Sequence, residues 1–465
     1  MSERRLFGTD GVRGVANRYP MTAEVALRLG RAVGYLLRRE HAAAGRAGRP
    51  CVVIGKDTRV SGYMIEHALV AGLCSAGVDS SLAGPLPTPG VAFLTVSRRA
   101  DAGLVISASH NPFEDNGVKI FARDGYKLPD ALEGELEALM ESAALDELRP
   151  TGEGVGRAAR ISDAVGRYNV AVKAAFPQHL TLSGLRVAVD CAHGAAYKVA
   201  PEVLAELGAE VIAVGVSPNG LNINDSCGAT HPEALAEVVR REGAHVGVCL
   251  DGDADRCILL DERGEALDGD QILAVLARAL QAQGRLRGGR VVTTVMSNLG
   301  LEAALAPLGV GVERVQVGDR YVVARMREAG LNLGGEQSGH TILQDYATTG
   351  DGLVAALAVL GVAVGEGRPL SALGAEMTRF PQVLKSFEVA GRPPLASLAG
   401  AQRAIREAEA ALGTRGRVLV RYSGTQAMAR VMVEGPALEQ VEGLAARISE
   451  ALVDDISARV ARGEG

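Results

Sequence analysis

The chain has 465 residues, of which 47% are hydrophobic and 22% charged, and its formal net charge is -6. This composition excludes an intrinsically disordered chain, and the length predicts three or four domains that each bury a core. Lys and Arg are scattered, which excludes the basic stripe of a nucleic-acid-binding protein. The N-terminus lacks a signal-like apolar stretch, and the longest apolar run, 353–364, is too short to span a membrane. We therefore expect a cytoplasmic protein with no nucleic-acid or membrane partner and with six reduced cysteines.

Short apolar, β-branched runs alternate with segments of helical period over the first three quarters of the chain. Such runs are typical of parallel strands that helices cover on both faces, so the pattern predicts an α/β fold repeated about three times. The predicted strands are 51–55, 103–107, 185–190, 210–214, 246–250, 290–295 and 311–317. The predicted helices between them are 22–39, 62–76, 198–207, 232–241, 270–283 and 320–329.

The order of elements changes after about residue 380. A strand (382–389), a long helix (394–412), two near-adjacent strands (418–422 and 430–434) and a terminal helix predict a smaller α+β domain with an antiparallel sheet. We place the α/β domains at 1–157, 158–258 and 259–376, and the C-terminal domain at 377–465.

A turn of small polar residues follows the predicted strand 103–107. Residues 106–112 read Ile-Ser-Ala-Ser-His-Asn-Pro, which would hold the hydroxyl of Ser109 at the carboxyl edge of a sheet, where α/β proteins bind ligands. Ser109 is a candidate nucleophile or phosphoryl carrier, and Lys119 is its candidate cationic partner. Ser, Asn and Pro are also ordinary turn residues, and for this motif alone an ordinary turn is the better interpretation.

Three carboxylates alternate in the turn after the predicted strand 246–250. Asp251, Asp253 and Asp255 have apolar residues on both sides, and unpaired carboxylates beside a core are costly without a cation. Oxygen ligands of this kind suit Mg²⁺, which keeps room for waters and a phosphate oxygen. We therefore predict one metal site here, with Arg256 as a fork for phosphate.

The same run resembles the first motif of haloacid dehalogenase-type phosphatases, in which an aspartate after a strand accepts the phosphoryl group. That interpretation makes Asp251 the nucleophile and Asp253 the acid. It expects Thr or Val two residues after the second aspartate, where this chain has Asp255.

A glycine-rich loop at 334–340 reads Gly-Gly-Glu-Gln-Ser-Gly-His. Glycines let a backbone come close to a ligand, and Glu336 and Ser338 can bond vicinal sugar hydroxyls. His340 is expected to titrate near neutrality and is a candidate general base. A plain glycine-rich loop with a surface histidine is the competing interpretation.

Two arginines flank a polar turn in the C-terminal domain. Arg421, Ser423, Gly424, Thr425 and Arg430 place two guanidinium groups and two hydroxyls around a glycine, which suits a phosphate dianion. A polar β-turn with incidental arginines explains this motif equally well when it is taken alone.

The N-terminal loop 7–14 is rich in glycine and contains Arg13. It is neither a Walker A motif nor a G-x-G-x-x-G fingerprint, and no such motif occurs elsewhere, which argues against a kinase or a dehydrogenase.

Taken in order, the segments 7–14, 107–121, 251–256, 334–340 and 421–435 resemble the α-D-phosphohexomutase superfamily over nearly the whole chain. The resemblance implies four domains: three related α/β domains with mixed or parallel sheets, and a smaller α+β domain at the C-terminus. It also implies that Ser109 is phosphorylated at rest, and that one Mg²⁺ joins this phosphate to Asp251, Asp253 and Asp255.

The resemblance further implies a role for each remaining motif. Lys119, His340 and Arg13 would serve catalysis, and Ser109 would exchange its phosphoryl group with the sugar through a 1,6-bisphosphate, which also serves as primer. The substrate would be bound by Arg256, Glu336, Ser338, Arg421, Ser423, Gly424, Thr425 and Arg430.

Gln337 and the segments 227–232 and 318–321 resemble the glucosamine branch of this superfamily. The branch implies an isomerase that interconverts glucosamine 6-phosphate and glucosamine 1-phosphate for amino-sugar nucleotides and the cell wall. The alternatives are a phosphomannomutase/phosphoglucomutase of the same superfamily and a non-catalytic sugar-phosphate sensor. A homo-oligomer and a kinase that first phosphorylates Ser109 stay open as partners.

Overall fold

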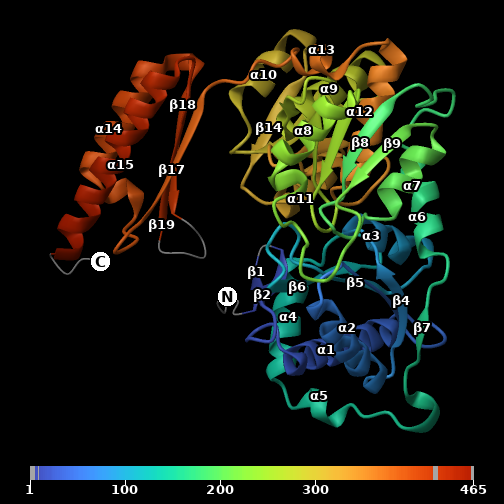
Figure 1. The fold of residues 1–465 in the computed structure, drawn as a ribbon. Coiled ribbons are helices and arrows are strands. Elements are labelled where there is room, and N and C mark those ends of the chain that lie inside the picture. Colours follow the sequence, from blue (N-terminus) through green and yellow to red (C-terminus); the bar gives the residue numbers. More distant parts are fainter. Residues whose placement is uncertain (1–5, 9, 423–427, 462–465) are drawn as a thin grey trace. The chain divides into compact units, whose positions relative to one another are not determined.

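The computed structural model describes residues 6–8, 10–422 and 428–461. Four sheets occur in this part of the chain, with seven, five, four and three strands, so the predicted fold class is confirmed. The chain divides into two compact units (Figure 1). One contains the residues up to 296 together with 308–376, and the other contains 297–307 together with the residues from 377 on.

The first sheet has the order β1-β2-β6-β5-β3-β4-β7. β3 is parallel to both β4 and β5, and β7 is parallel to β4, whereas β6, β2 and β1 continue the sheet in antiparallel pairs. The strands are β1 (Phe7–Gly8), β2 (Gly11–Val15), β3 (Cys51–Lys56), β4 (Asp79–Pro85), β5 (Ala102–Ile106), β6 (Asp115–Ala122) and β7 (Ala158–Arg160). The helices are α1 (Ala23–Ala43), α2 (Ser61–Ser75), α3 (Thr88–Ser97), α4 (Asp130–Glu141) and α5 (Ala144–Glu147).

The second sheet has the order β12-β11-β10-β8-β9, and the third has the order β14-β13-β15-β16. Each has parallel strands and an antiparallel edge, β11 with β12 in the second sheet and β16 in the third. The strands are β8 (Arg186–Asp190), β9 (Glu210–Val214), β10 (Val246–Leu250), β11 (Cys257–Leu260), β12 (Ala266–Leu267), β13 (Arg290–Thr294), β14 (Gly311–Val315), β15 (Leu333–Gly335) and β16 (Thr341–Leu343). The helices are α6 (Ala164–Lys173), α7 (Val199–Glu206), α8 (Pro232–Glu242), α9 (Gly269–Ala282), α11 (Asp319–Ala329), α12 (Gly352–Glu366) and α13 (Leu370–Gly374).

Helix α12 contains the longest apolar run of the chain, and most of its side chains are buried. Its first turn is capped by Asp351, whose carboxylate accepts the N–H groups of Leu353 and Val354. None of the described helices is long and apolar enough to cross a membrane. All six cysteines are free thiols.

The fourth sheet, in the second unit, has the order β17-β19-β18 and is antiparallel throughout, and the antiparallel pairing was predicted. Its core is formed by apolar residues of the sheet and of its two long helices. The elements of this unit are β17 (Gln382–Glu388), β18 (Arg417–Tyr422), β19 (Met428–Glu434), α10 (Leu299–Leu305), α14 (Ala399–Leu412) and α15 (Leu438–Ala461).

The same kind of connection recurs in the first three sheets. A strand that is parallel to one neighbour (β5, β10 or β15) ends, a short loop follows, and the next strand (β6, β11 or β16) returns antiparallel beside it. These three loops contain the serine, aspartate and glycine-rich motifs. Because each reversal occurs where a parallel strand ends, it places polar residues at the carboxyl edge of its sheet.

Candidate active site

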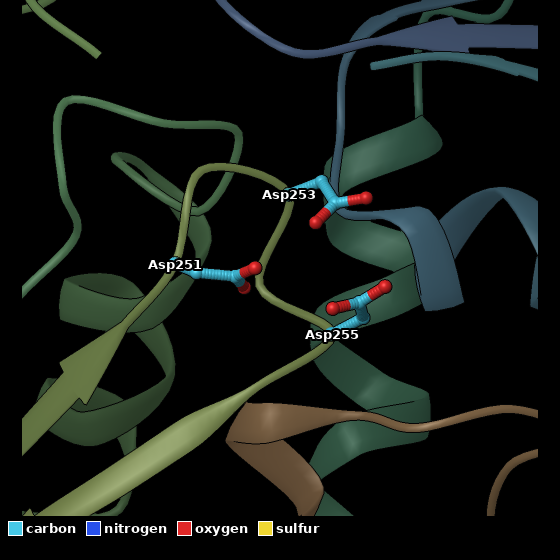
Figure 2. A group of neighbouring side chains, drawn as sticks. All are labelled: Asp251, Asp253 and Asp255. Carbon is cyan, nitrogen blue, oxygen red and sulfur yellow. The ribbon is translucent and has the colours of Figure 1, made fainter. Parts of the chain in front are cut away.

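The three alternating aspartates lie together in the turn between β10 and β11. Figure 2 shows their side chains on this one turn, and their carboxylate oxygens all lie within 4.8 Å of one another. All three are buried, and the Oδ1 atoms of Asp253 and Asp255 have no hydrogen-bond partner among the described residues. Burial, with the neighbouring Asp255 and Asp253, raises the pKa of Asp251 to about 7. Crowded, buried carboxylates whose oxygens are not all used in hydrogen bonds fit a hard divalent cation, so the residues present suit the predicted metal.

Ser109 lies against these aspartates. It follows β5, is 1% exposed, and its Oγ donates a hydrogen bond of 2.6 Å to Asp251 Oδ2. The Nδ1 atom of His110 lies 3.3 Å from the same Oγ, and burial, with the nearby Arg256 and Arg13, lowers the pKa of His110 to about 4. The serine predicted as a phosphoryl carrier and the predicted metal site therefore share one location.

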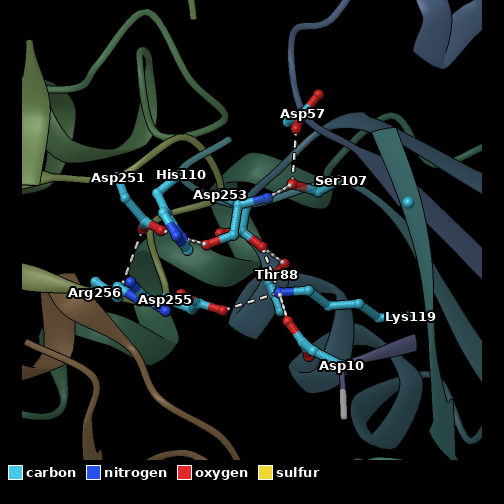
Figure 3. A network of polar contacts seen from close by, with 12 residues as sticks. Asp10, Asp57, Thr88, Ser107, His110, Lys119, Asp251, Asp253, Asp255 and Arg256 are labelled. Atoms are coloured by element: carbon cyan, nitrogen blue, oxygen red, sulfur yellow. Dashed lines mark hydrogen bonds and ion pairs between the residues drawn. The ribbon is translucent and has the colours of Figure 1, made fainter. Parts of the chain in front are cut away.

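Lys119 reaches the same turn from β6. Its Nζ donates to Asp253 Oδ2 at 2.8 Å and to Asp255 Oδ2 at 3.0 Å, and it lies 3.4 Å from Asp10 Oδ2. Burial lowers the pKa of Lys119, but the three carboxylates outweigh burial and hold it well above its usual value. The lysine is thus a fixed cation beside the aspartates (Figure 3).

His340 differs from its prediction. It is 3% exposed, with Nδ1 3.6 Å from Asp255 Oδ1 and Nε2 3.3 Å from Asp319 Oδ2. Burial disfavours the charged ring, but Asp319 and Asp255 raise the pKa of His340 to about 10. The expected titration near neutrality is therefore wrong in this state. His340 is a cation at pH 7, which suits a proton donor better than a general base.

Asp10, Lys127 and Asp319, which the sequence did not single out as site residues, connect the charged groups around the aspartates. The Nζ of Lys127 lies 2.5 Å from both Asp10 Oδ1 and Asp319 Oδ2, and Arg13 forms an ion pair with Asp10. Charges of alternating sign thus run in a closed ring from Asp10 through Lys119, Asp255, His340, Asp319 and Lys127 back to Asp10. Each buried charge in the ring has opposite charges beside it, which offsets its cost of burial.

The glycine-rich loop after β15 packs tightly on the start of β11. Gly339 has φ +93°, and a Cβ atom there would lie 2.4 Å from the carbonyl oxygen of Cys257. The carbonyl of Gly339 also accepts the N–H of Cys257 at 3.0 Å. This close approach requires glycine, and it fixes the loop beside the turn that contains the aspartates.

The predicted sugar-binding residues lie in these two loops. Glu336 is half-buried and accepts the N–H of Gly318 at 3.1 Å, whereas Ser338 is exposed. Arg256 donates its backbone N–H to Asp251 Oδ1 at 3.2 Å, and its Nε has no hydrogen-bond partner among the described residues.

The two predicted phosphate-binding arginines lie opposite each other in the fourth sheet, Arg421 on β18 and Arg430 on β19. Burial and the charge of Arg430 lower the pKa of Arg421. The Nε of Arg430 is buried and has no hydrogen-bond partner in the described part of the chain. Ser423, Gly424 and Thr425 lie outside the described residues.

Further polar residues around the site were also missed. Thr88 Oγ1 donates to Asp253 Oδ2 at 2.6 Å, and Asp57 accepts from Ser107 Oγ at 2.7 Å (Figure 3). Asp57, and Arg59, which donates to it, come just after the end of β3. Ser109 was identified because it is a polar residue just after a buried strand, and the same argument would have found these two residues.

The chain matches all four domains of one enzyme family over most of its length. The matches are to "Phosphoglucomutase/phosphomannomutase", alpha/beta/alpha domain I over residues 4–147, domain II over 166–264, domain III over 268–380 and the C-terminal domain over 384–451.

Curated relatives are similar over nearly their whole length. A phosphoglucosamine mutase of Anaeromyxobacter dehalogenans is 57% identical and covers 97% of this chain and 99% of its own. One of Caulobacter vibrioides is 58% identical over 94% of this chain and 97% of its own. The crystal structure of a phosphoglucomutase/phosphomannomutase family protein from Burkholderia thailandensis shares the fold, with a TM-score of 0.78 and 24% identity over 96% of this chain and 97% of that one. The chain therefore belongs to the phosphoglucomutase/phosphomannomutase family of the α-D-phosphohexomutase superfamily.

Proposed function

We propose that the protein is a phosphoglucosamine mutase, an isomerase that interconverts glucosamine 6-phosphate and glucosamine 1-phosphate. The observation that carries this proposal is the buried contact of 2.6 Å between Ser109 Oγ and Asp251, within a cluster of three aspartates. It is supported by relatives with this name at 57% and 58% identity over nearly the full chain. The activity would place the protein in the cytoplasm with its sugar phosphates.

The three aspartates would hold one divalent cation, which we propose to be Mg²⁺. When bound, it would supply positive charge to the phosphate oxygens near Ser109. The other cations of the site belong to the chain itself. Lys119 and His340 stand beside Asp253 and Asp255, where they would balance the charge of a transferring phosphoryl group.

The chemistry exchanges one phosphorus–oxygen bond for another. A free hydroxyl of the sugar phosphate attacks the phosphoryl group on Ser109, the bond from phosphorus to Oγ breaks, and the sugar becomes a 1,6-bisphosphate. The hydroxyl proton ends on Ser109 Oγ, which as a free hydroxyl donates to Asp251 as observed. After the bisphosphate turns around, its other phosphoryl group returns to Ser109, and the serine proton passes to the departing sugar oxygen. Priming of Ser109 would come from the bisphosphate or from a kinase.

Substrate binding would be divided between two sets of residues. Glu336, Ser338 and Arg256 would contact the sugar hydroxyls and a phosphate from the loops of the second and third sheets. Arg421 and Arg430, with the turn 423–425, would bind the phosphate that is not reacting. Recognition through hydroxyls and phosphate suits both orientations of the bisphosphate.

Two measurements test the proposal. Phosphopeptide mass spectrometry should find the phosphoryl group on Ser109, whereas an aspartyl phosphate at Asp251 with unmodified serine would identify a phosphatase instead. With Mg²⁺ and a bisphosphate primer, kcat/KM should favour glucosamine 6-phosphate over glucose 6-phosphate by roughly tenfold or more, about 1.4 kcal/mol of discrimination. Equal or better turnover of glucose 6-phosphate would contradict the substrate and leave the mutase reaction intact.

A further inference from the structure

The loop that carries Ser109 has no regular secondary structure to hold it. It runs between β5 and β6, and Ser109 itself has φ +52°, a left-handed conformation that non-glycine residues rarely adopt. A loop of this kind exposes carbonyl groups that neither a helix nor a strand satisfies. Backbone N–H groups satisfy the carbonyls of Ala108 and Pro112, whereas those of Ser109 and Asn111 accept from side chains.

Arg59, 0% exposed, supplies most of that support. Its Nη2 donates to the carbonyl oxygens of Ser109 at 2.9 Å and Asn111 at 2.8 Å. Its Nη1 donates to the carbonyl oxygen of Asp115 at 3.0 Å and also to that of Pro112. One guanidinium group thus donates to four carbonyls, three in the loop and one at Asp115, where β6 begins.

The remaining N–H of this guanidinium, on Nε, donates to Asp57 Oδ2 at 2.8 Å. All five donors of Arg59 are therefore used. Asp57 in turn accepts from Ser107 Oγ at 2.7 Å, and Ser107 Oγ accepts the backbone N–H of Ser109 at 2.9 Å. Both the N–H and the C=O of Ser109 are connected to the Asp57–Arg59 ion pair (Figure 3 shows the contact of Asp57 with Ser107).

A second support reaches the loop from the segment after β9. Asn224 Nδ2 donates to the carbonyl oxygens of Ser109 at 2.9 Å and Asn111 at 3.1 Å, so Arg59 and Asn224 share two acceptors. Gly252, next to Asp251, lies so close that a Cβ atom there would be 2.6 Å from the Ser109 carbonyl oxygen. The serine backbone is therefore fixed against the turn that contains the aspartates.

We propose that Arg59 is a positioning residue that, through Asp57 and Ser107, holds the phosphorylated Ser109 in line with the sugar hydroxyl and so limits loss of the phosphoryl group to water. This inference rests on the proposed function. Both transfers need the attacking oxygen in line with the bond from phosphorus to Oγ, but the sugar hydroxyl is fixed by the sugar's own contacts, whereas a small water can move into line when the phosphoryl group shifts. Loosening the loop therefore lowers transfer to the sugar more than it lowers hydrolysis.

The test is Arg59→Lys, which keeps the charge facing Asp57 but offers three donors in place of five. We expect kcat for the mutase reaction to fall roughly 100-fold, as a displaced reacting group predicts, with KM within about threefold of wild type. Phosphate released to water per mutase turnover should rise at least about tenfold. Sugar isomerisation and inorganic phosphate are measured in one reaction with glucosamine 6-phosphate, Mg²⁺ and primer.

Glu66→Gln is the matched control. It removes the charge from a buried ion pair, 2.6 Å between Lys56 Nζ and Glu66 Oε2, in the same domain, and no hydrogen bond or ion pair among the described residues joins Glu66 to the Ser109 loop. Its thermal midpoint should fall while kcat and the ratio of hydrolysis to transfer stay at wild-type values. If Arg59→Lys does not fold, Ser107→Ala tests the same path, because it breaks only the link between Asp57 and the Ser109 N–H.

Folded variants at positions 59 or 107 with wild-type kcat and a wild-type hydrolysis ratio would overturn the inference. So would a rise in hydrolysis in Glu66→Gln equal to that in Arg59→Lys. A wild-type protein that carries phosphoryl on Ser109 but does not isomerise the sugar phosphate would instead overturn the proposed function.

Discussion

The cluster around the three aspartates and the arginine pair of the fourth sheet differ in how their charges are paired. Around the aspartates, each cation lies between carboxylates: Lys119 contacts three of them and His340 two. In the fourth sheet, Arg421 faces Arg430 directly across two strands. The first region is organised before a substrate arrives, and its carboxylates suit the proposed cation. The second holds an excess of positive charge that a phosphate dianion would relieve. We therefore expect damage to the first region to lower kcat, and damage to the second to raise KM.

Ser109→Ala should give the largest effect. Without the hydroxyl, no phosphoserine can form, so mutase turnover should fall at least about 1,000-fold while the fold is kept. The measurement is sugar isomerisation, with mass spectrometry to confirm that no phosphopeptide remains. Ser75→Ala, at the end of α2, is the matched control and should keep full activity. Residual activity near wild type would mean that the phosphoryl carrier is another group.

Asp253→Asn should have the next largest effect, because it removes one charge from the proposed metal site while an oxygen can still accept from Thr88. Affinity for Mg²⁺ or Mn²⁺, measured by calorimetry, should fall at least about tenfold, and kcat should fall with it. Chelation of the wild-type protein should abolish turnover, and added Mg²⁺ should restore it. Asp261→Asn alters a buried aspartate that accepts backbone N–H groups at 263 and 265, and it should leave metal affinity unchanged.

Arg421→Gln tests the other side of the comparison. Losing a charged hydrogen-bond donor to phosphate should raise KM roughly tenfold or more with kcat within a few-fold of wild type. The thermal midpoint should not fall, because the substitution relieves repulsion with Arg430. Steady-state kinetics with Arg406→Gln, an exposed arginine on α14, provide the control. A loss confined to kcat would show that the two regions do not divide chemistry and binding in this way.

Asp351→Asn should give the smallest effect, on stability rather than turnover. Burial raises the pKa of Asp351 to about 6, so the folded state binds a proton more tightly than the unfolded state does. Stability from this group is present below pH 4 and is lost as pH rises toward 6, by on the order of 2–3 kcal/mol. The asparagine still caps α12 and should remove this loss, so the variant gains relative to wild type between pH 4 and 6.

Thermal midpoints across this pH range measure the difference between the two proteins. Tyr168→Phe should enlarge the loss seen in wild type, because the tyrosine hydroxyl donates to Asp351 at 2.7 Å and lowers its pKa. Parallel pH profiles for wild type and Asp351→Asn would contradict the assignment.

The sequence predicted those parts of the site that are local. Asp251, Asp253 and Asp255 occupy one turn, so their spacing alone brings them together. The strand and helix positions were predicted closely where apolar periodicity was strong. The three return strands β6, β11 and β16 were missed, because their apolar residues closely follow the motifs. The predicted helix at 394 begins only at Ala399, after a 3-10 turn.

The rest of the site depends on residues that are distant in sequence. Lys127 contacts Asp10 and Asp319 across separations of 117 and 192 residues, which no local pattern reveals. The two carboxylates beside His340, Asp255 and Asp319, come from other elements, so the sequence did not reveal them. An ordinary pKa near neutrality was therefore expected for His340. Arg59 acts mainly on backbone carbonyls, which every residue has, so its sequence position does not indicate which loop it supports.

The repeated return of an antiparallel strand beside a parallel one has a consequence for how this architecture can diversify. Each of the three loops that contain the serine, aspartate and glycine-rich motifs joins two neighbouring strands of one sheet. Residues in such a loop can be exchanged while the sheet itself stays unchanged. The serine and aspartate hairpins can stay constant while the glycine-rich hairpin changes. With residues 336–338 contacting the sugar as proposed, sugar preference could change separately from phosphoryl transfer, and exchanging these three residues would test whether the protein can be redirected to another hexose phosphate.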